Sequence, residues 1–190
     1  MSLSALSARA EISDKSLVRS FSYINGKWCA SSNGEVVAVH DPATGDFIGD
    51  VTAMTAEDSS AAVDAAHAAF ASWALMLPQD RCAILRRWFE LMIEHKEDLA
   101  RLMVLEQGKP LSEARGEIEY GAAFVEFYAE ESKRPNIEGV TSHLPDAEVE
   151  LWREPVGVAA LITPWNFPSA MLTRKAAAAL DLPAELGGRD

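Results

Sequence analysis

The chain has 190 residues, of which 48% are hydrophobic and 24% are charged, a composition typical of a soluble globular protein. Its 29 acidic and 17 basic residues give a net charge of −12, which argues against nucleic acid or an anionic membrane surface as a partner. No apolar run approaches the ~20 residues of a membrane span, and the N-terminus lacks the apolar core of a signal peptide. Two isolated cysteines, Cys29 and Cys82, indicate a reducing compartment and predict neither a disulfide framework nor a metal site. We therefore expect a cytoplasmic protein.

The first 50 residues favour short β elements after a polar N-terminus. Residues 1–20 are small and polar, which predicts a flexible lead-in or a short helix. Strand-like residues 21–24 and 27–29 flank Asn25-Gly26, a dipeptide that supplies both positive-φ positions of a type I′ turn, so a hairpin is expected. A second pair of strands is predicted at residues 35–40 and 47–51.

Three amphipathic helices are predicted next. The first starts at a capping box, Thr55 to Asp58, and the second starts at Pro78, where a missing N–H is tolerated. The apolar face of the second helix continues as far as Met103, with Gly108 as its C-cap. The third helix is expected from 112 to 133. Its acidic residues could suggest acid/base chemistry, but we interpret them as a solvated face: Glu117, Glu119, Glu126, Glu130 and Glu131.

The region from 148 to 180 is the most informative. Residues 148–153 alternate polar and apolar side chains, as in a half-exposed strand. A continuous apolar run, 156–162, is then broken by the turn-forming residues 163–168 and followed by an alanine-rich helical pattern. This order predicts a buried strand of an α/β unit, and ligands gather at the carboxyl ends of such strands. Asn166 therefore lies where chemistry is expected.

Several motifs, in their order along the chain, resemble the aldehyde dehydrogenase superfamily. Their sequences look most like those of its succinate-semialdehyde dehydrogenase branch. The resemblance covers almost all of residues 20–180. Its motifs are Tyr23 to Trp28, Asp41 to Gly45, Glu106-Gln107-Gly108-Lys109-Pro110-Leu111, Glu154 to Val158, Pro164-Trp165-Asn166-Phe167-Pro168 and Thr173-Arg174-Lys175. It implies an α/β fold class, with residues 21–180 forming the N-terminal portion of the family domain. That portion would comprise helices, an incomplete Rossmann-like parallel sheet and part of the oligomerisation arm, to which residues 148–153 belong.

The resemblance also implies a chemistry, in which the family oxidises aldehydes to carboxylic acids with NAD or NADP. A cysteine thiolate attacks the carbonyl, and a preorganised amide donor can stabilise the resulting oxyanion by ~3–4 kcal/mol. The resemblance gives that role to Asn166, whereas the alternative is an Asn that caps the following helix. It places the cofactor against Ile162, Thr163, Pro164, Trp165 and Asn166.

Three residues after this loop are candidates for further roles in the site. Arg174 matches the position where semialdehyde-acid enzymes hold a distal carboxylate; a surface salt bridge is the alternative. Lys175 matches a lysine of the proton-relay and cofactor neighbourhood, or else is a charge on the helix surface. Met171 would line the substrate channel or simply pack in the core.

The resemblance stops after Leu180, and residues 181–190 form a divergent tail. The tail sequence Glu185-Leu186-Gly187-Gly188 is similar to a family motif. Coincidence, an internal deletion, a shifted reading frame or a fragment end could each explain this similarity. Neither Cys29 nor Cys82 matches the surroundings of the nucleophile. We therefore expect these 190 residues alone to be marginally stable and without turnover. The leading hypothesis is an N-terminal segment of a homo-oligomeric succinate-semialdehyde dehydrogenase; the alternatives are glutarate semialdehyde, a general aldehyde, or a non-catalytic remnant that pairs with intact subunits.

Overall fold

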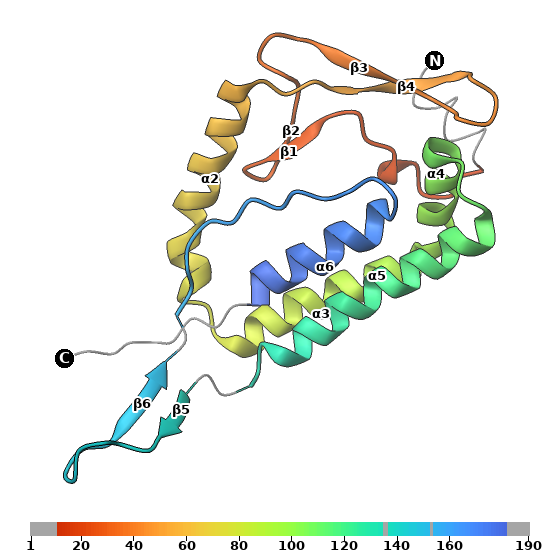
Figure 1. The fold of residues 1–190 in the computed structure, drawn as a ribbon. Helices are drawn as coiled ribbons and strands as arrows, with labels where there is room; N and C mark the ends of the chain where they lie inside the picture. The colour runs from red at the N-terminus through yellow and green to blue at the C-terminus, as the bar shows by residue number, and fades with distance from the viewer. Residues whose placement is uncertain (1–10, 135–136, 153, 182–190) are drawn as a thin grey trace.

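The computed structural model describes residues 11–134, 137–152 and 154–181, and its α/β elements are shown in Figure 1. Along the chain they are η1 (Lys15–Leu17), β1 (Ser22–Ile24), β2 (Lys27–Cys29), β3 (Val36–His40), β4 (Phe47–Thr52), α2 (Ala56–Ala74), α3 (Pro78–Glu94), α4 (Lys96–Gln107), α5 (Leu111–Glu131), β5 (Ile137–Val140), β6 (Val149–Trp152) and α6 (Pro168–Asp181).

Helices α3, α5 and α6 pack side by side and, together with α4, contain the main core (Figure 1). α5 lies between the other two, and its small side chains allow a close approach to α6. A Cβ added at Gly121 would lie 2.9 Å from Oγ1 of Thr173 and 3.2 Å from Cα of Ala170. The fully or nearly fully buried residues of this core are Leu85, Met92, Ala100, Met103, Ala114, Ile118, Ala122, Val125, Ala129 and Ala177.

We expect Gly121→Ala to destabilise the protein by about 1–3 kcal/mol, because the added methyl group must push α6 away from α5. Gly116 lies in the same helix, but a Cβ there would meet nothing within 4 Å. Gly116→Ala should therefore stabilise by about 0.4–1 kcal/mol through the unfolded chain. Urea unfolding measures both variants, and equal signs for the two would contradict the close helix contact.

The two N-terminal hairpins are confirmed. β1 pairs with β2 in antiparallel fashion, and the turn residues Asn25 and Gly26 have φ of 49° and 75°, as a type I′ turn requires. β3 pairs with β4 in the same way, with a register irregularity between Val39 and His40.

Helix α2 begins at the predicted capping box. Thr55 accepts a hydrogen bond from the Asp58 amide, and the Asp58 carboxylate accepts one from the Thr55 amide at 2.9 Å. This backbone hydrogen bond from Thr55, more than any other contact, lowers the pKa of Asp58 to about 2. The stabilisation is therefore complete above the ordinary pKa of 3.8 and is lost as the pH falls towards 2. The apolar face of α2 is not covered, since no α2 residue is buried and Val63 is 55% exposed.

The long second helix of the prediction is wrong, because the structure divides it at His95 into α3 and α4. His95 has φ −98° and ψ 17°, outside helical geometry. After the division, α4 contacts two clusters. Like α3, it packs against α5 and contributes to the main core, and its Leu105 also packs with Ile12, Val18 and Ile48 in a second cluster.

Of the two alternatives for the N-terminus, a flexible lead-in or a short helix, the short helix is found within residues 11–20, which pack against α4. Ile12 and Val18 are buried, and residues 15–17 form the short 3-10 helix η1. The amides of Ser13 and Asp14 donate to the Asp98 carboxylate at 2.9 and 2.8 Å. Residues 1–10 lie outside the described part, as do residues 182–190 of the tail.

The predicted buried strand at 156–162 does not form, and the sheets of the described residues are all antiparallel pairs. The segment runs extended from β6 past α2 to the start of α6 (Figure 1). Val156 and Ile162 are 88% and 84% exposed. The physical reason is that a parallel strand requires neighbouring strands, and the described residues supply none beside this segment.

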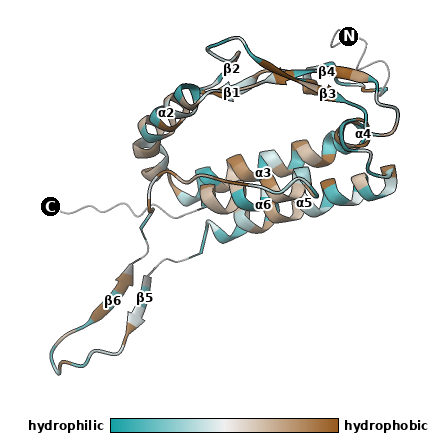
Figure 2. Cartoon of the chain, turned by 45° about the horizontal axis from the view of Figure 1, so that its top comes forward, coloured by the Kyte–Doolittle hydropathy of each residue, from teal (hydrophilic) through white to brown (hydrophobic). Residues whose placement is uncertain are grey.

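A two-stranded ribbon, β5 paired with β6, stands clear of the helical layer in Figure 2. The predicted strand at 148–153 is thus confirmed for Val149–Trp152, and its partner β5 was not among the predicted strands. Val140, Val149 and Leu151 on this ribbon are exposed.

Candidate active site

The candidate site residues lie on one continuous piece of chain, from the extended segment into α6. Ile162 to Asn166 are exposed, and Trp165 is 82% exposed. The chain turns at residues 165–167, and α6 begins at Pro168. Asn166 is therefore presented at the surface of a tight connection between an extended segment and a helix.

The first turn of α6, directly after the loop of residues 163–167, is bonded to a carboxylate that was expected to be solvated. Glu117 of α5 has only 1% of its side chain exposed, so its assignment to a solvated face is wrong. Its Oε1 accepts from the amides of Ser169 and Ala170, at 2.9 and 3.2 Å, in the first turn of α6. Its Oε2 forms an ion pair with Lys109. The burial follows from these partners, because a carboxylate is removed from water only when its charge is compensated.

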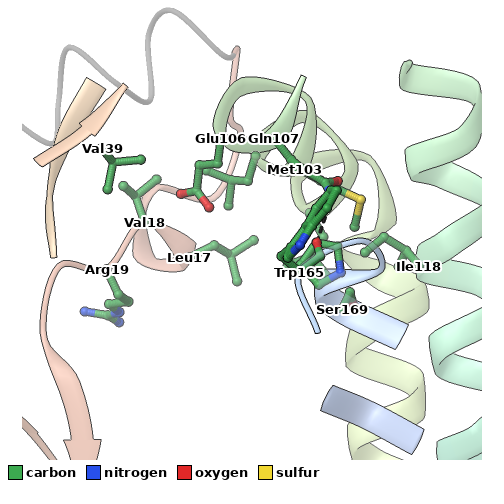
Figure 3. Close-up of a pocket in the computed structure, with 13 residues that line it drawn as sticks. Leu17, Val18, Arg19, Val39, Met103, Glu106, Gln107, Ile118, Trp165 and Ser169 are labelled. Atoms are coloured by element: carbon green, nitrogen blue, oxygen red, sulfur yellow. Dashed lines mark hydrogen bonds between the residues drawn. The ribbon is translucent and has the colours of Figure 1, made fainter. Parts of the chain in front are cut away.

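Two residues of the predicted Glu106-to-Leu111 motif hold the loop from its other side. Gln107 Nε2 donates to the Trp165 carbonyl at 2.9 Å, marked by a dashed line in Figure 3. Lys109 Nζ donates to the Asn166 carbonyl at 3.3 Å and lies 4.1 Å from the centre of the Phe167 ring. Gly108 makes this approach possible, since it adopts φ 74° and a Cβ there would lie 2.9 Å from Pro42 Cγ. No sequence pattern connects Gln107 or Glu117 to a loop more than 50 residues away.

These contacts bear on the two roles considered for Asn166. A helix-capping Asn would accept hydrogen bonds from the first amides of α6. Those of Ser169 and Ala170 are already bonded to Glu117. The arrangement thus argues against the capping role, and it leaves the side chain of Asn166 exposed beside a backbone carbonyl that Lys109 holds.

The structure places the other candidates along α6. Lys175 Nζ donates to the carbonyl of Ile162, so it contacts the segment expected to form the cofactor wall. Arg174 is exposed and lies 5.7 Å from the centre of the Phe124 ring, a cation–π distance. No ion pair of Arg174 is observed among the described residues. Met171 is half-buried.

A cavity of about 520 Å³ lies on the η1 side of the loop, lined by Trp165, Gln107, Met103 and Val18 among others (Figure 3). Its lining does not include Asn166, Arg174 or Lys175, so the cavity and the candidate catalytic residues are separate. Within the described ranges, no cluster of three or more His, Cys, Asp or Glu residues could hold a metal ion. The helices of those ranges are all too short or too polar to cross a membrane.

Comparison with known proteins identifies the class of protein that this loop and helical layer define. The model of the aldehyde dehydrogenase family matches residues 28–182. The chain is 52% identical to an aspartate-semialdehyde dehydrogenase (non-phosphorylating) of Halomonas elongata and 49% identical to a succinate-semialdehyde dehydrogenase [NADP(+)] of Escherichia coli. Each match covers 90% of this chain, and 34% and 35% of those proteins respectively. The crystal structure of an E. coli NADP-dependent enzyme superposes with a TM-score of 0.88 at 49% identity, covering 90% of this chain and 36% of that one.

The chain belongs to the aldehyde dehydrogenase family. It spans about a third of the length of the curated relatives it matches, and its fold corresponds to the N-terminal part of theirs.

Proposed function

We propose that this chain is the N-terminal segment of an NAD- or NADP-dependent dehydrogenase that oxidises a semialdehyde to the carboxylic acid. The observation that carries the proposal is the exposed Asn166 on a loop whose backbone is bonded to Gln107 and Lys109 and is followed by a helix turn bonded to Glu117. A fixed amide donor is what a developing oxyanion requires, because the site then needs no reorganisation when the charge forms.

The reaction begins with attack of a cysteine thiolate on the aldehyde carbonyl, which creates the oxyanion beside Asn166. Cys29 lies in β2 and Cys82 in α3, and neither is assigned the role of nucleophile. Reduction of NAD+ or NADP+ by a full-length dehydrogenase that carries this segment, followed by absorbance with succinate semialdehyde as substrate, tests the proposal. Absence of turnover with any semialdehyde would refute it.

The cofactor would lie along Ile162 to Asn166. This segment suits the role because its residues are exposed and are not part of a sheet. The carbonyls of Ile162, Trp165 and Asn166 accept hydrogen bonds from side chains of this chain. Bound there, NAD or NADP supplies the hydride acceptor. The names of the E. coli relative and of the E. coli structure favour NADP.

Arg174 determines the substrate class in this proposal, and succinate semialdehyde is favoured over glutarate semialdehyde or a neutral aldehyde. Both named relatives act on semialdehydes that also carry an acid group. We expect Arg174→Ala, in the full-length dehydrogenase, to raise KM for succinate semialdehyde about tenfold or more, since a charge-assisted hydrogen bond contributes about 1.5–3 kcal/mol. The KM for propanal should change less than twofold. Equal effects on the two substrates would contradict the proposed contact between Arg174 and the substrate carboxylate. Met171 would then be interpreted as a core residue.

The β5–β6 ribbon is the proposed contact for a homo-oligomer. Val149 and Leu151 project from the same face of β6, both are exposed, and the ribbon has free edges. We expect Leu151→Asp to shift the full-length protein towards smaller assemblies in light scattering, because it places a charge in an apolar contact. Glu148→Gln, next to the same strand, should leave the mass unchanged; an unchanged mass for Leu151→Asp would place the interface elsewhere.

A further inference from the structure

Lys109 and Glu117 form the most buried ion pair in the described part of the chain, with 11% and 1% of their side chains exposed. The other carboxylates of α5 that form ion pairs remain in contact with solvent. Glu119, for example, is 57% exposed beside Lys96. A buried ion pair is a weak source of stability compared with an apolar pair of similar volume, so the presence of this pair requires a different explanation.

The contacts of the pair explain it. Glu117 accepts from the Ser169 and Ala170 amides after the loop, and Lys109 donates to the Asn166 carbonyl within it. The positive end of the α6 dipole favours the carboxylate at this place. The pair therefore spans the short piece of chain that contains Asn166, and each member orients the other.

We propose that Lys109 and Glu117 are positioning residues, which fix the backbone of Asn166 so that its carboxamide meets the oxyanion. This inference rests on the proposed function of Asn166. It adds that the precision of the oxyanion site comes from a buried charge pair outside the loop. A displacement of about 1 Å at a reacting centre can lower the rate about 10²-fold. A loop held only by solvent-exposed hydrogen bonds would therefore position the Asn166 carboxamide poorly.

The first experiment measures hydrogen exchange at single amides of this chain by NMR. In Glu117→Gln, the Ser169 and Ala170 amides should exchange at least tenfold faster, because they lose the charged acceptor that makes their hydrogen bonds strong. The Ala177 amide, farther along α6, should change less than twofold. Glu119→Gln removes the same charge from the same helix and should alter none of these rates. Unchanged rates at Ser169 and Ala170 in Glu117→Gln would overturn the proposal.

A double variant, Lys109→Gln with Glu117→Gln, addresses the possibility that the single variant unfolds. It leaves no unpaired buried charge, so the fold should persist, while the Ser169 and Ala170 amides should still exchange faster. Slow exchange in the folded double variant would show that the charges are unnecessary and would overturn the proposal.

The second experiment uses the full-length dehydrogenase. The double variant should lower kcat about 10²-fold and change KM for NADP+ by less than twofold. The single variant Lys109→Arg keeps the charge pair, so its kcat should lie between those of the double variant and the unchanged enzyme. If Asn166→Ala lowers kcat but the double variant does not, only the positioning role fails. If Asn166→Ala leaves kcat unchanged, the proposed function fails, whereas the exchange rates still report whether the pair holds the loop.

Discussion

Replacing Asn166 with Ala is expected to lower kcat about 10²–10³-fold in a full-length dehydrogenase that carries this segment, the loss measured when one oxyanion donor is removed from an enzyme. The KM for the aldehyde should change little, because the donor acts on charge that develops only after attack. Steady-state rates with succinate semialdehyde give both quantities. The reason for a specific effect is structural: the neighbouring backbone is held by Gln107, Lys109 and Glu117 and not by the side chain of Asn166.

Thermal unfolding provides the control for this variant. Asn166 is exposed and the first amides of α6 are bonded elsewhere, so Asn166→Ala should shift Tm by less than about 2 °C, within the small range of surface substitutions. A large drop in Tm with an intact kcat would instead assign Asn166 to helix capping.

Glu117→Ala is expected to destabilise the protein by about 3–5 kcal/mol, because it leaves the Lys109 ammonium buried without its counter-charge. It also removes the acceptor of two amides of α6. Urea unfolding of the full-length dehydrogenase that carries this segment measures the change. Lys109→Ala should have an effect of similar size, since it leaves the Glu117 carboxylate unpaired in the same way.

The matched control is Glu119→Ala, which removes an exposed partner of Lys96 from the same helix. Exposed ion pairs contribute about 0–1 kcal/mol, so this variant should be close to neutral. The double variant of Lys109 and Glu117 to Ala should cost less than the sum of the two single changes, because the residues share one interaction. Full additivity would mean that the two side chains act independently.

Elements governed by neighbouring residues were predictable from the sequence. The Asn25-Gly26 turn, the Thr55–Asp58 cap and the left-handed Gly108 each depend on a few adjacent positions, and each appears in the structure as expected. The break at His95 has no such signal, since neither Gly nor Pro stands there. Beyond the break, α4 contacts both the main core, through Ala100 and Met103, and the second cluster, through Leu105.

In the candidate site too, features set by adjacent residues were predictable, whereas contacts between residues far apart in the chain were not. Asn166 and its turn are visible in the sequence, but the burial of Glu117 is not, because a Glu on an amphipathic helix is normally solvated. Its partner amides lie 52 and 53 residues farther along the chain. For 156–162, the apolar pattern predicts a strand that does not form, because a strand needs a neighbouring strand and the described residues provide none.

The separation between Glu117 and the start of α6 also has a kinetic consequence. Helices α3 and α5 can form from local contacts soon after collapse, whereas the bonds from Glu117 to Ser169 close a loop of 52 residues that includes the β5–β6 ribbon. Contacts of such separation form late, because chain entropy must be lost before the contact is gained. The loop that carries Asn166 would thus be among the last parts of this chain to order during folding and among the first to open when α6 leaves α5.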